Sequence, residues 1–134
     1  MGTRLGYPSS STEMFKILQI VHSFVPHTFA GTEVYTYNLA KELAKRHKVS
    51  VLFRINDPRK KEYSLSCSKE EDIQRYALNR TFRFCGSFED TYLDGNADKI
   101  FKELLDEINP DIVHVQHLLF LSHVVLKIHR RHLI

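Results

Sequence analysis

The chain has 134 residues, of which 43% are hydrophobic and 26% are charged, and its formal net charge is +3. This composition is typical of a soluble domain with one core, and the length is too small for two full domains. No apolar stretch reaches the roughly 18 uncharged residues that a membrane-spanning helix needs, which excludes a membrane span.

Residues 1–13 are rich in Ser, Thr, Gly and Pro and lack the apolar centre of a signal peptide. They are therefore predicted to form a disordered N-terminal arm, followed by one folded domain over residues 14–134. The first element of this domain is an apolar run over residues 15–21. Such a run is typical of a parallel strand that is buried on both faces.

Residues 32–46 have the period of a helix. Tyr35, Leu39 and Leu43 recur every four residues, which predicts an amphipathic helix with these three side chains facing the core. Residues 49–53 are rich in β-branched and aromatic residues and indicate a second strand. A strand, a helix and a strand in succession form a βαβ unit, which predicts an α/β fold with a mostly parallel sheet covered by helices.

The middle of the chain has less regular patterns. Strands are predicted over residues 62–66 and 81–84, with a further extended segment near residues 73–76. Asn96 is a good N-cap for a second helix, which Pro110 ends. The apolar stripe of this helix, predicted to face the core, consists of Ile100, Phe101, Leu104, Leu105 and Ile108.

The last predicted elements are a strand over residues 111–117 and a helix that Ser122 caps. A doubly wound sheet would continue with another strand, so we expect the sheet to be incomplete at its C-terminal edge. An open edge can pair with a second copy of the chain, which makes homodimerisation through this edge an expectation.

The loop over residues 24–31 joins the first strand to the first helix. It contains one glycine, Gly31, and matches neither a dinucleotide-binding nor a P-loop pattern. The N–H groups of the first helical turn, at Gly31, Thr32 and Glu33, can receive a phosphate or hydroxyl oxygen. Alternatively, the segment is a tight turn in which Thr32 caps the helix and Glu33 meets its dipole. Both interpretations are open on the residues alone.

Two histidines mark the last strand. His114 and His117 are three residues apart, and on a strand such residues face opposite sides, so we expect no shared metal ion. His114 is predicted to be a core residue, whereas His117 follows the carboxyl end of the strand, where open α/β sheets bind ligands. His117 is therefore the functional candidate, with a solvent-exposed structural residue as the alternative. Cys67 and Cys85 lack the spacing of a zinc site or a disulfide framework, which favours a reducing cytoplasm.

Three stretches together resemble a known family. AGTE, the YTYNLAKELAKR helix that follows it, and PDIVHVQH near the end of the chain are similar to the N-terminal domain of retaining glycosyltransferases of the GT-B fold, family 4. The similarity runs over residues 14–134. It implies a Rossmann-like three-layer sandwich with a mostly parallel sheet. It also implies that a nucleotide-diphosphate sugar is the donor substrate, with no other cofactor.

The resemblance assigns roles to particular residues. Ala30, Gly31, Thr32 and Glu33 would lie against the diphosphate of the donor, and His117 would be the catalytic residue that reaches the donor sugar. The family commonly has two glycines in this loop, and Ala30 stands in place of the first.

In that family, the N-terminal domain shapes the acceptor site and a second domain holds most of the nucleotide-sugar. The resemblance therefore implies an acceptor-side domain that transfers a sugar to a glycan, lipid or small-molecule acceptor. We expect this chain alone to be inactive, because half a cleft cannot hold the leaving group or exclude water. A separate C-terminal half is the partner expected. One alternative is a non-catalytic carbohydrate- or anion-binding module on the same fold. The other is a flavodoxin-like or nucleotide-binding regulator, which is disfavoured because no acidic cluster or phosphate loop follows a strand.

Other partners follow from the distribution of charge. The basic residues are dispersed and no aromatic-basic RNA motif is present, so we expect no nucleic-acid partner. Lys127, Arg130 and Arg131 can meet anionic lipid headgroups, which predicts weak peripheral contact with the inner face of the membrane.

Overall fold

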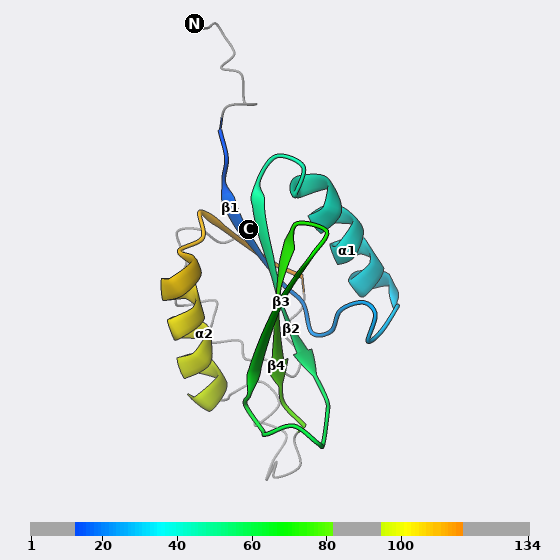
Figure 1. Cartoon of the computed structure of the whole chain (residues 1–134), viewed down its shortest axis with the longest axis vertical. Helices are drawn as coiled ribbons and strands as arrows, with labels where there is room; N and C mark the ends of the chain where they lie inside the picture. Colours follow the sequence, from blue (N-terminus) through cyan, green and yellow to red (C-terminus); the bar gives the residue numbers. More distant parts are fainter. Residues whose placement is uncertain (1–12, 82–94, 117–134) are drawn as a thin grey trace, which may run out of the picture.

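A computed structural model describes residues 13–81 and 95–116 (Figure 1). In chain order its elements are β1 (Lys16–Ile20), α1 (Gly31–Leu43), β2 (Lys48–Ile55), β3 (Leu65–Glu70), β4 (Ile73–Asn79), α2 (Gly95–Ile108) and β5 (Ile112–Val115). Among these residues, neither helix combines the length and the apolar character that crossing a membrane requires.

The five strands form one sheet in the order β3-β4-β2-β1-β5. β1, β2, β4 and β5 run parallel, and β3 alone pairs antiparallel, with β4. The mostly parallel sheet that the sequence predicts is therefore confirmed. β1 lies between β2 and the edge strand β5, so the direction of winding reverses between β1 and β5. Open α/β sheets bind ligands outside the carboxyl ends of the strands at such a reversal.

Side chains that alternate along the strands build two cores. Leu18 of β1 and Leu52 of β2 pack with Phe101 of α2. Val51 of β2, on the opposite face, belongs to a second core with Ala40 of α1. Figure 1 shows the same arrangement, with α1 and α2 on opposite sides of the sheet. The three-layer sandwich is thus confirmed.

The buried face of α1 differs from the predicted one. Tyr35 is 56% exposed, whereas the helix buries Glu33, Thr36 and Ala40. The Thr36 hydroxyl donates to the carbonyl of Thr32 (2.7 Å), so its burial leaves no hydroxyl unpaired. A search for apolar periodicity cannot find this face, because two of its three members are polar. The helix also begins at Gly31 after an N-cap at Ala30, so Thr32 is not the cap.

The middle of the chain is a β-hairpin. β3 begins at Leu65, so only the end of the predicted strand over residues 62–66 is correct, whereas the segment predicted near residues 73–76 is the start of β4. Glu71 and Asp72 connect the two strands, and both have positive φ angles, of 53° and 64°. Two such residues in succession fit a tight hairpin turn.

The third strand predicted in this region, over residues 81–84, is wrong at Thr81, which follows β4 outside any strand, and its other residues lie outside the described part. β3 has the sequence LSCSKE and is mostly exposed. Because most of its residues are polar, a search for alternating apolar residues does not detect this strand. The turn residues Glu71 and Asp72 also lack the usual hairpin signal of Asn-Gly or Asp-Gly.

The second half follows the predictions more closely. α2 buries Phe101, Leu104 and Leu105 as expected, although it begins at Gly95, so Asn96 lies within the helix and does not cap it. β5 lies within its predicted range. His114 is only half-buried and is not a core residue as predicted. Residues 1–12, His117 and the helix predicted from Ser122 lie outside the described residues.

Candidate functional site

The carboxyl ends of β1 and β5 lie side by side. Ile20 pairs with Val115, and the N–H of Gln116 donates to the carbonyl of Ile20 at 2.7 Å. From Val21 the chain leaves the sheet through a loop over residues 21–30 and returns as α1. The end of β1 and the residue after β5 thus lie together at the reversal in the sheet, and the loop after β1 leads from this point to the first turn of α1.

A buried carboxylate organises the start of α1. Glu33 is 1% exposed, and its Oε2 accepts hydrogen bonds from the N–H of Ala30 (3.0 Å) and from Thr28 Oγ1 (2.9 Å). Its Oε1 lies 3.4 Å from His22 Nε2. Ala30 has no side-chain acceptor, so Glu33 provides the side-chain contact with the helix N-terminus. A negative charge at this end is stabilised by the helix dipole.

Thr28 extends the network to the end of β1. Its Oγ1 lies 2.9 Å from Ser23 Oγ as well as 2.9 Å from Glu33 Oε2. A carboxylate can only accept, and a threonine hydroxyl has one proton, so Thr28 donates to Glu33 and accepts from Ser23. We call His22, Ser23, Thr28, Glu33 and Gln116 the rim site.

A polar pair links the rim site to the centre of the sheet. Gln19 of β1 is fully buried, and its Oε1 accepts a hydrogen bond from Gln116 Nε2 at 3.0 Å. Gln116 Nε2 also lies 3.4 Å from the ring nitrogens of His114. Gln19 Nε2 has no partner among the described residues. A buried donor without a partner costs about 1–3 kcal/mol. Gln19 and Gln116 therefore keep the interior beneath the rim site polar and lower the stability of the fold.

Arg75 of β4 holds the loop on the sheet. This side chain is nearly buried, and its Nη2 donates to the carbonyl of Val25 while Nη1 lies 3.3 Å from Glu70 Oε2. Its guanidinium lies 5.0 Å from the ring centre of Phe24 and 5.4 Å from that of Phe53. Hydrogen bonds and cation–π contacts therefore fix the loop from below.

A hollow of about 430 Å³ opens beside the same loop. We call it the loop hollow, and its lining residues are Val25, Pro26, Phe29, Val34, Tyr37, Asn38, Glu70, Glu71 and Arg75. Tyr37 donates to Glu71 Oε1 at 2.6 Å, and this hydrogen bond raises the pKa of the Tyr37 hydroxyl. Phe29 is 69% exposed. The hollow thus offers an aromatic surface together with carboxylate and amide groups.

The structure brings the four predicted loop residues together in the first turn of α1. Ala30 and Gly31 are exposed, Thr32 is half-buried and Glu33 is buried. A side chain added at Gly31 would meet no atom within 4 Å, so the space in front of this residue is open. His117 lies outside the described residues. No group of three or more potential metal ligands occurs within residues 13–81 and 95–116.

Sequence reasoning missed most of the rim site. His22 and Ser23 directly follow an apolar strand, and polar residues at the carboxyl end of a strand are the signal that could have identified them. Gln19 and Gln116 gave a second signal, since each is an uncharged amide within or just after an apolar run. Neither signal indicates that Glu33 is buried.

Comparisons with known proteins identify the family and the fold. The family model for Glycosyltransferase Family 4 matches residues 29–134. The catalytic domain of starch synthase IV from Arabidopsis thaliana, bound to ADP and acarbose, superimposes with a TM-score of 0.51 at 16% identity, covering 77% of this chain and 28% of that one. This likeness supports the fold.

A second structure, described as trehalose-6-phosphate from E. coli bound with UDP-2-fluoro glucose, has a TM-score of 0.42 and 10% identity over 75% of this chain and 26% of that one. No curated protein sequence matches the chain significantly. The chain thus corresponds to about a quarter of the length of either solved structure. Because the family model matches most of the chain, and the fold is that of the N-terminal domain of a GT-B glycosyltransferase, the chain belongs to Glycosyltransferase Family 4.

Proposed function

We propose that the chain is the acceptor-side domain of an enzyme that transfers a sugar from a nucleotide-diphosphate sugar to a glycan, lipid or small-molecule acceptor. The observation that carries the proposal is the position of the first turn of α1, which buried Glu33 holds beside the end of β1, the strand that pairs with β5. Membership of a glycosyltransferase family supports the class of reaction.

The first turn of α1 has the properties of a diphosphate site. Its N–H groups have no partner within the helix, so they can donate hydrogen bonds to phosphate oxygens. The open space at Gly31 allows phosphate oxygens to approach the backbone. Ala30 has φ −71° and ψ 171°, a conformation that any residue adopts, so alanine in place of the family's usual glycine introduces no backbone strain.

His117 is the residue we propose to contact the donor sugar. Gln116 is hydrogen-bonded to Ile20 through its backbone, so the chain leaves β5 directly beside the end of β1. Gln116, the residue before His117 in the chain, therefore lies at the same edge as the diphosphate site. The loop hollow, with its aromatic and carboxylate groups, is the place we propose for part of the acceptor, because this combination binds sugar rings and hydroxyl groups.

Transfer needs more than this domain. The leaving diphosphate and the developing positive charge on the sugar have to be stabilised together in a site that excludes water. We propose that a second domain supplies the opposite wall, and that the chain of 134 residues binds diphosphate weakly and transfers no sugar by itself.

The experiment that tests the proposal changes Gly31. Gly31→Pro removes one N–H at the first helical position, where proline is tolerated, and the extended backbone of Ala30 accepts a following proline. Gly31→Ala keeps the N–H and adds one methyl group. Inorganic pyrophosphate is titrated into the full chain and followed by NMR shifts of amides in residues 21–34.

We expect pyrophosphate binding to weaken about threefold to tenfold in Gly31→Pro and less in Gly31→Ala, since one hydrogen bond to a charged group is lost in the first variant. Gly95→Ala is the matched control, because Gly95 also begins a helix and has open space around it. Equal binding by all four proteins would contradict the proposed diphosphate site.

A further inference from the structure

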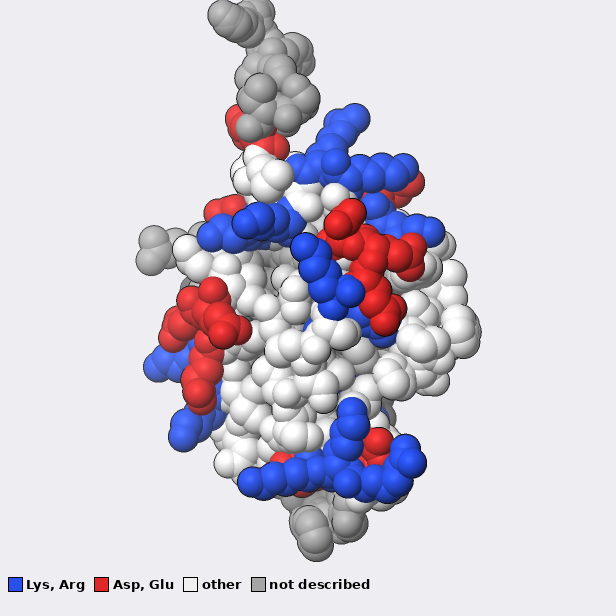
Figure 2. Space-filling view, viewed as in Figure 1, with Lys and Arg blue, Asp and Glu red and all other residues white. Residues whose placement is uncertain are grey.

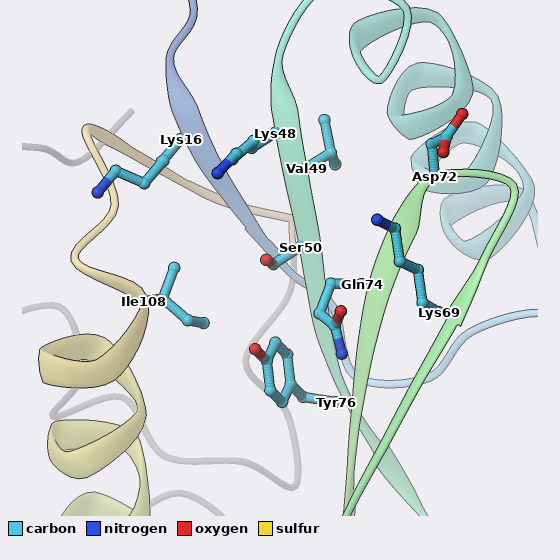
Figure 3. Close-up of a pocket in the computed structure, with 9 residues that line it drawn as sticks. All are labelled: Lys16, Lys48, Val49, Ser50, Lys69, Asp72, Gln74, Tyr76 and Ile108. Carbon is cyan, nitrogen blue, oxygen red and sulfur yellow. The ribbon is translucent and has the colours of Figure 1, made fainter.

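A cavity of about 440 Å³ lies at the edge of the sheet opposite the rim site, where β1, β2 and β4 begin (Figure 3). We call it the lysine cavity, and its lining residues are Lys16, Lys48, Val49, Ser50, Lys69, Asp72, Gln74, Tyr76 and Ile108. It lies between the sheet and the last turn of α2. The length of the sheet separates it from the first turn of α1.

The strand register explains why polar groups converge there. Lys16 pairs with Lys48, while Gln74 pairs with both Ser50 and Lys69. Paired residues point to the same face of a sheet, so these five side chains share the face that α2 partly covers. Figure 3 shows Lys48 and Ser50 directed from β2 toward the end of α2, with Lys69 next to Gln74.

The three lysines of the cavity have no ion-pair partners within the part of the chain that the structure describes. Among the described residues, the lysine ion pairs involve Lys41 and Lys45, and none involves a lysine of the cavity. Asp72 is the carboxylate in the lining, and nearby Asp111 accepts a hydrogen bond from the backbone N–H of Lys16 at 2.8 Å. The lining therefore carries three positive charges against one negative charge. Figure 2 shows basic side chains gathered at this end of the molecule, beside a group of acidic ones.

Neutral donors complete the lining. The side chains of Ser50, Gln74 and Tyr76 make no hydrogen bond within the described residues. Tyr76 is 9% exposed, and burial, together with the charges of Cys67 and Glu107, raises the pKa of its hydroxyl. This hydroxyl therefore stays protonated at neutral pH and can donate a hydrogen bond.

We propose that the lysine cavity binds the phosphate group of a small anionic ligand, at a second site that is independent of sugar transfer. Lysines act as point charges for phosphate, and a tetrahedral oxyanion can accept from several surrounding donors at once. The volume falls within the range of small-molecule sites, roughly 300–1,000 Å³. A nucleic acid would need a longer basic surface.

The test uses a double substitution of exposed residues, so that folding is preserved. Lys48→Gln with Lys69→Gln removes two charges from the cavity, and Lys99→Gln with Lys102→Gln removes two from the exposed surface of α2. Inorganic phosphate, glycerol 3-phosphate and, as a neutral probe, glycerol are titrated into the full chain at low salt. Binding is followed by NMR shifts of the amides of Ser50, Gln74 and Tyr76.

We expect the cavity variant to bind phosphate about five- to tenfold more weakly than the α2 variant. Each removed lysine eliminates one exposed ion pair with the phosphate, and such a pair contributes modestly to the binding free energy. Stronger binding of glycerol 3-phosphate than of inorganic phosphate assigns the site to phosphomonoesters, whereas equal binding assigns it to free phosphate. Equal weakening in both double variants, or shifts that glycerol reproduces, would overturn the proposal.

Tyr76→Phe provides a second measurement, because it keeps the ring and removes only the donor. We expect it to weaken phosphate binding about two- to fivefold. Gly31→Pro leaves phosphate binding in the lysine cavity unchanged. The measurements can therefore contradict the proposal for the lysine cavity without contradicting the proposal for the diphosphate site, and the reverse.

Discussion

Charged side chains differ in burial and in partners between the two ends of the strands, which we call the carboxyl edge and the amino edge of the sheet. At the carboxyl edge, Glu33 is buried and has several partners within the protein, and Arg75, which holds the loop of that edge from the middle of the sheet, is buried with several partners as well. At the amino edge, Lys48 and Lys69 are exposed and have none among the described residues. Buried charges with partners fix a loop in one conformation, whereas exposed charges without partners are available to a ligand. Substitutions at the carboxyl edge should therefore change stability, and substitutions at the amino edge should change binding.

The largest effect is expected at Glu33. Glu33→Ala leaves the Ala30 N–H and the Thr28 hydroxyl without their acceptor, so we expect the free energy of unfolding to fall by about 3 kcal/mol. Glu33→Gln keeps one acceptor oxygen and should lose about half as much. Urea unfolding measures both.

Glu42→Ala is the control for this change. Glu42 belongs to the same helix, but it is exposed, and among the described residues its ion pair is with Lys45 alone, so its loss should cost less than about 0.5 kcal/mol. A similar effect of the two alanine variants would show that burial and hydrogen bonding do not set Glu33 apart from an exposed carboxylate.

Arg75 should have the next largest effect. Arg75→Met keeps an apolar stem beside Phe24 and Phe53 but removes the donors to the carbonyl of Val25. We expect about 2 kcal/mol of destabilisation and faster amide exchange in residues 21–30. Arg59→Met, at a side chain that is 89% exposed, should change neither quantity. Unchanged exchange in the loop would show that Arg75 does not hold it.

The smallest effect depends on pH. Burial alone would raise the pKa of Glu62, but hydrogen bonds from the N–H and hydroxyl of Thr81 and from Arg80 together lower it. A lowered pKa stabilises the fold above the pKa of the unfolded chain, and this contribution is lost as the pH falls through that value toward the folded one.

We therefore expect Glu62→Gln to lower the free energy of unfolding by about 1 kcal/mol at pH 7. The loss should become smaller at acidic pH, because Glu62 of the parent protein is then protonated and uncharged as well. Urea unfolding at pH 7 and pH 3 measures the difference. Glu103→Gln, on the exposed surface of α2, is the control. A cost that is the same at both pH values would contradict the assignment of Glu62.

The elements that sequence analysis predicts best are those with an apolar pattern. β1, β2 and α2 each contain several apolar residues at the spacing of their structure, so their positions follow directly. β3 has no such pattern. The turn at Glu71 and Asp72 adopts a left-handed conformation without asparagine or glycine. Neither feature can be read from local composition.

The site was predictable only in outline. Gly31 and its neighbours do lie at the start of a helix at the carboxyl edge. The burial of Glu33 depends on its contacts with His22 and Thr28, and the loop depends on Arg75, which lies fifty residues away from Val25 in the chain. Contacts of this kind arise from the tertiary fold, so periodicity cannot reveal them. The position of His117 stays a prediction.

The place of β1 between β2 and β5 also determines the order in which the sheet can assemble. β1 is synthesised first among the strands, and Ile17 pairs with Val49 of β2 but also with Ile112 of β5. Closing the longer loop costs more entropy, and contacts between distant residues form more slowly. We therefore expect nascent chains to form the β1–β2 pair well before β5 is added, so that the reversal between β1 and β5 is completed late in folding.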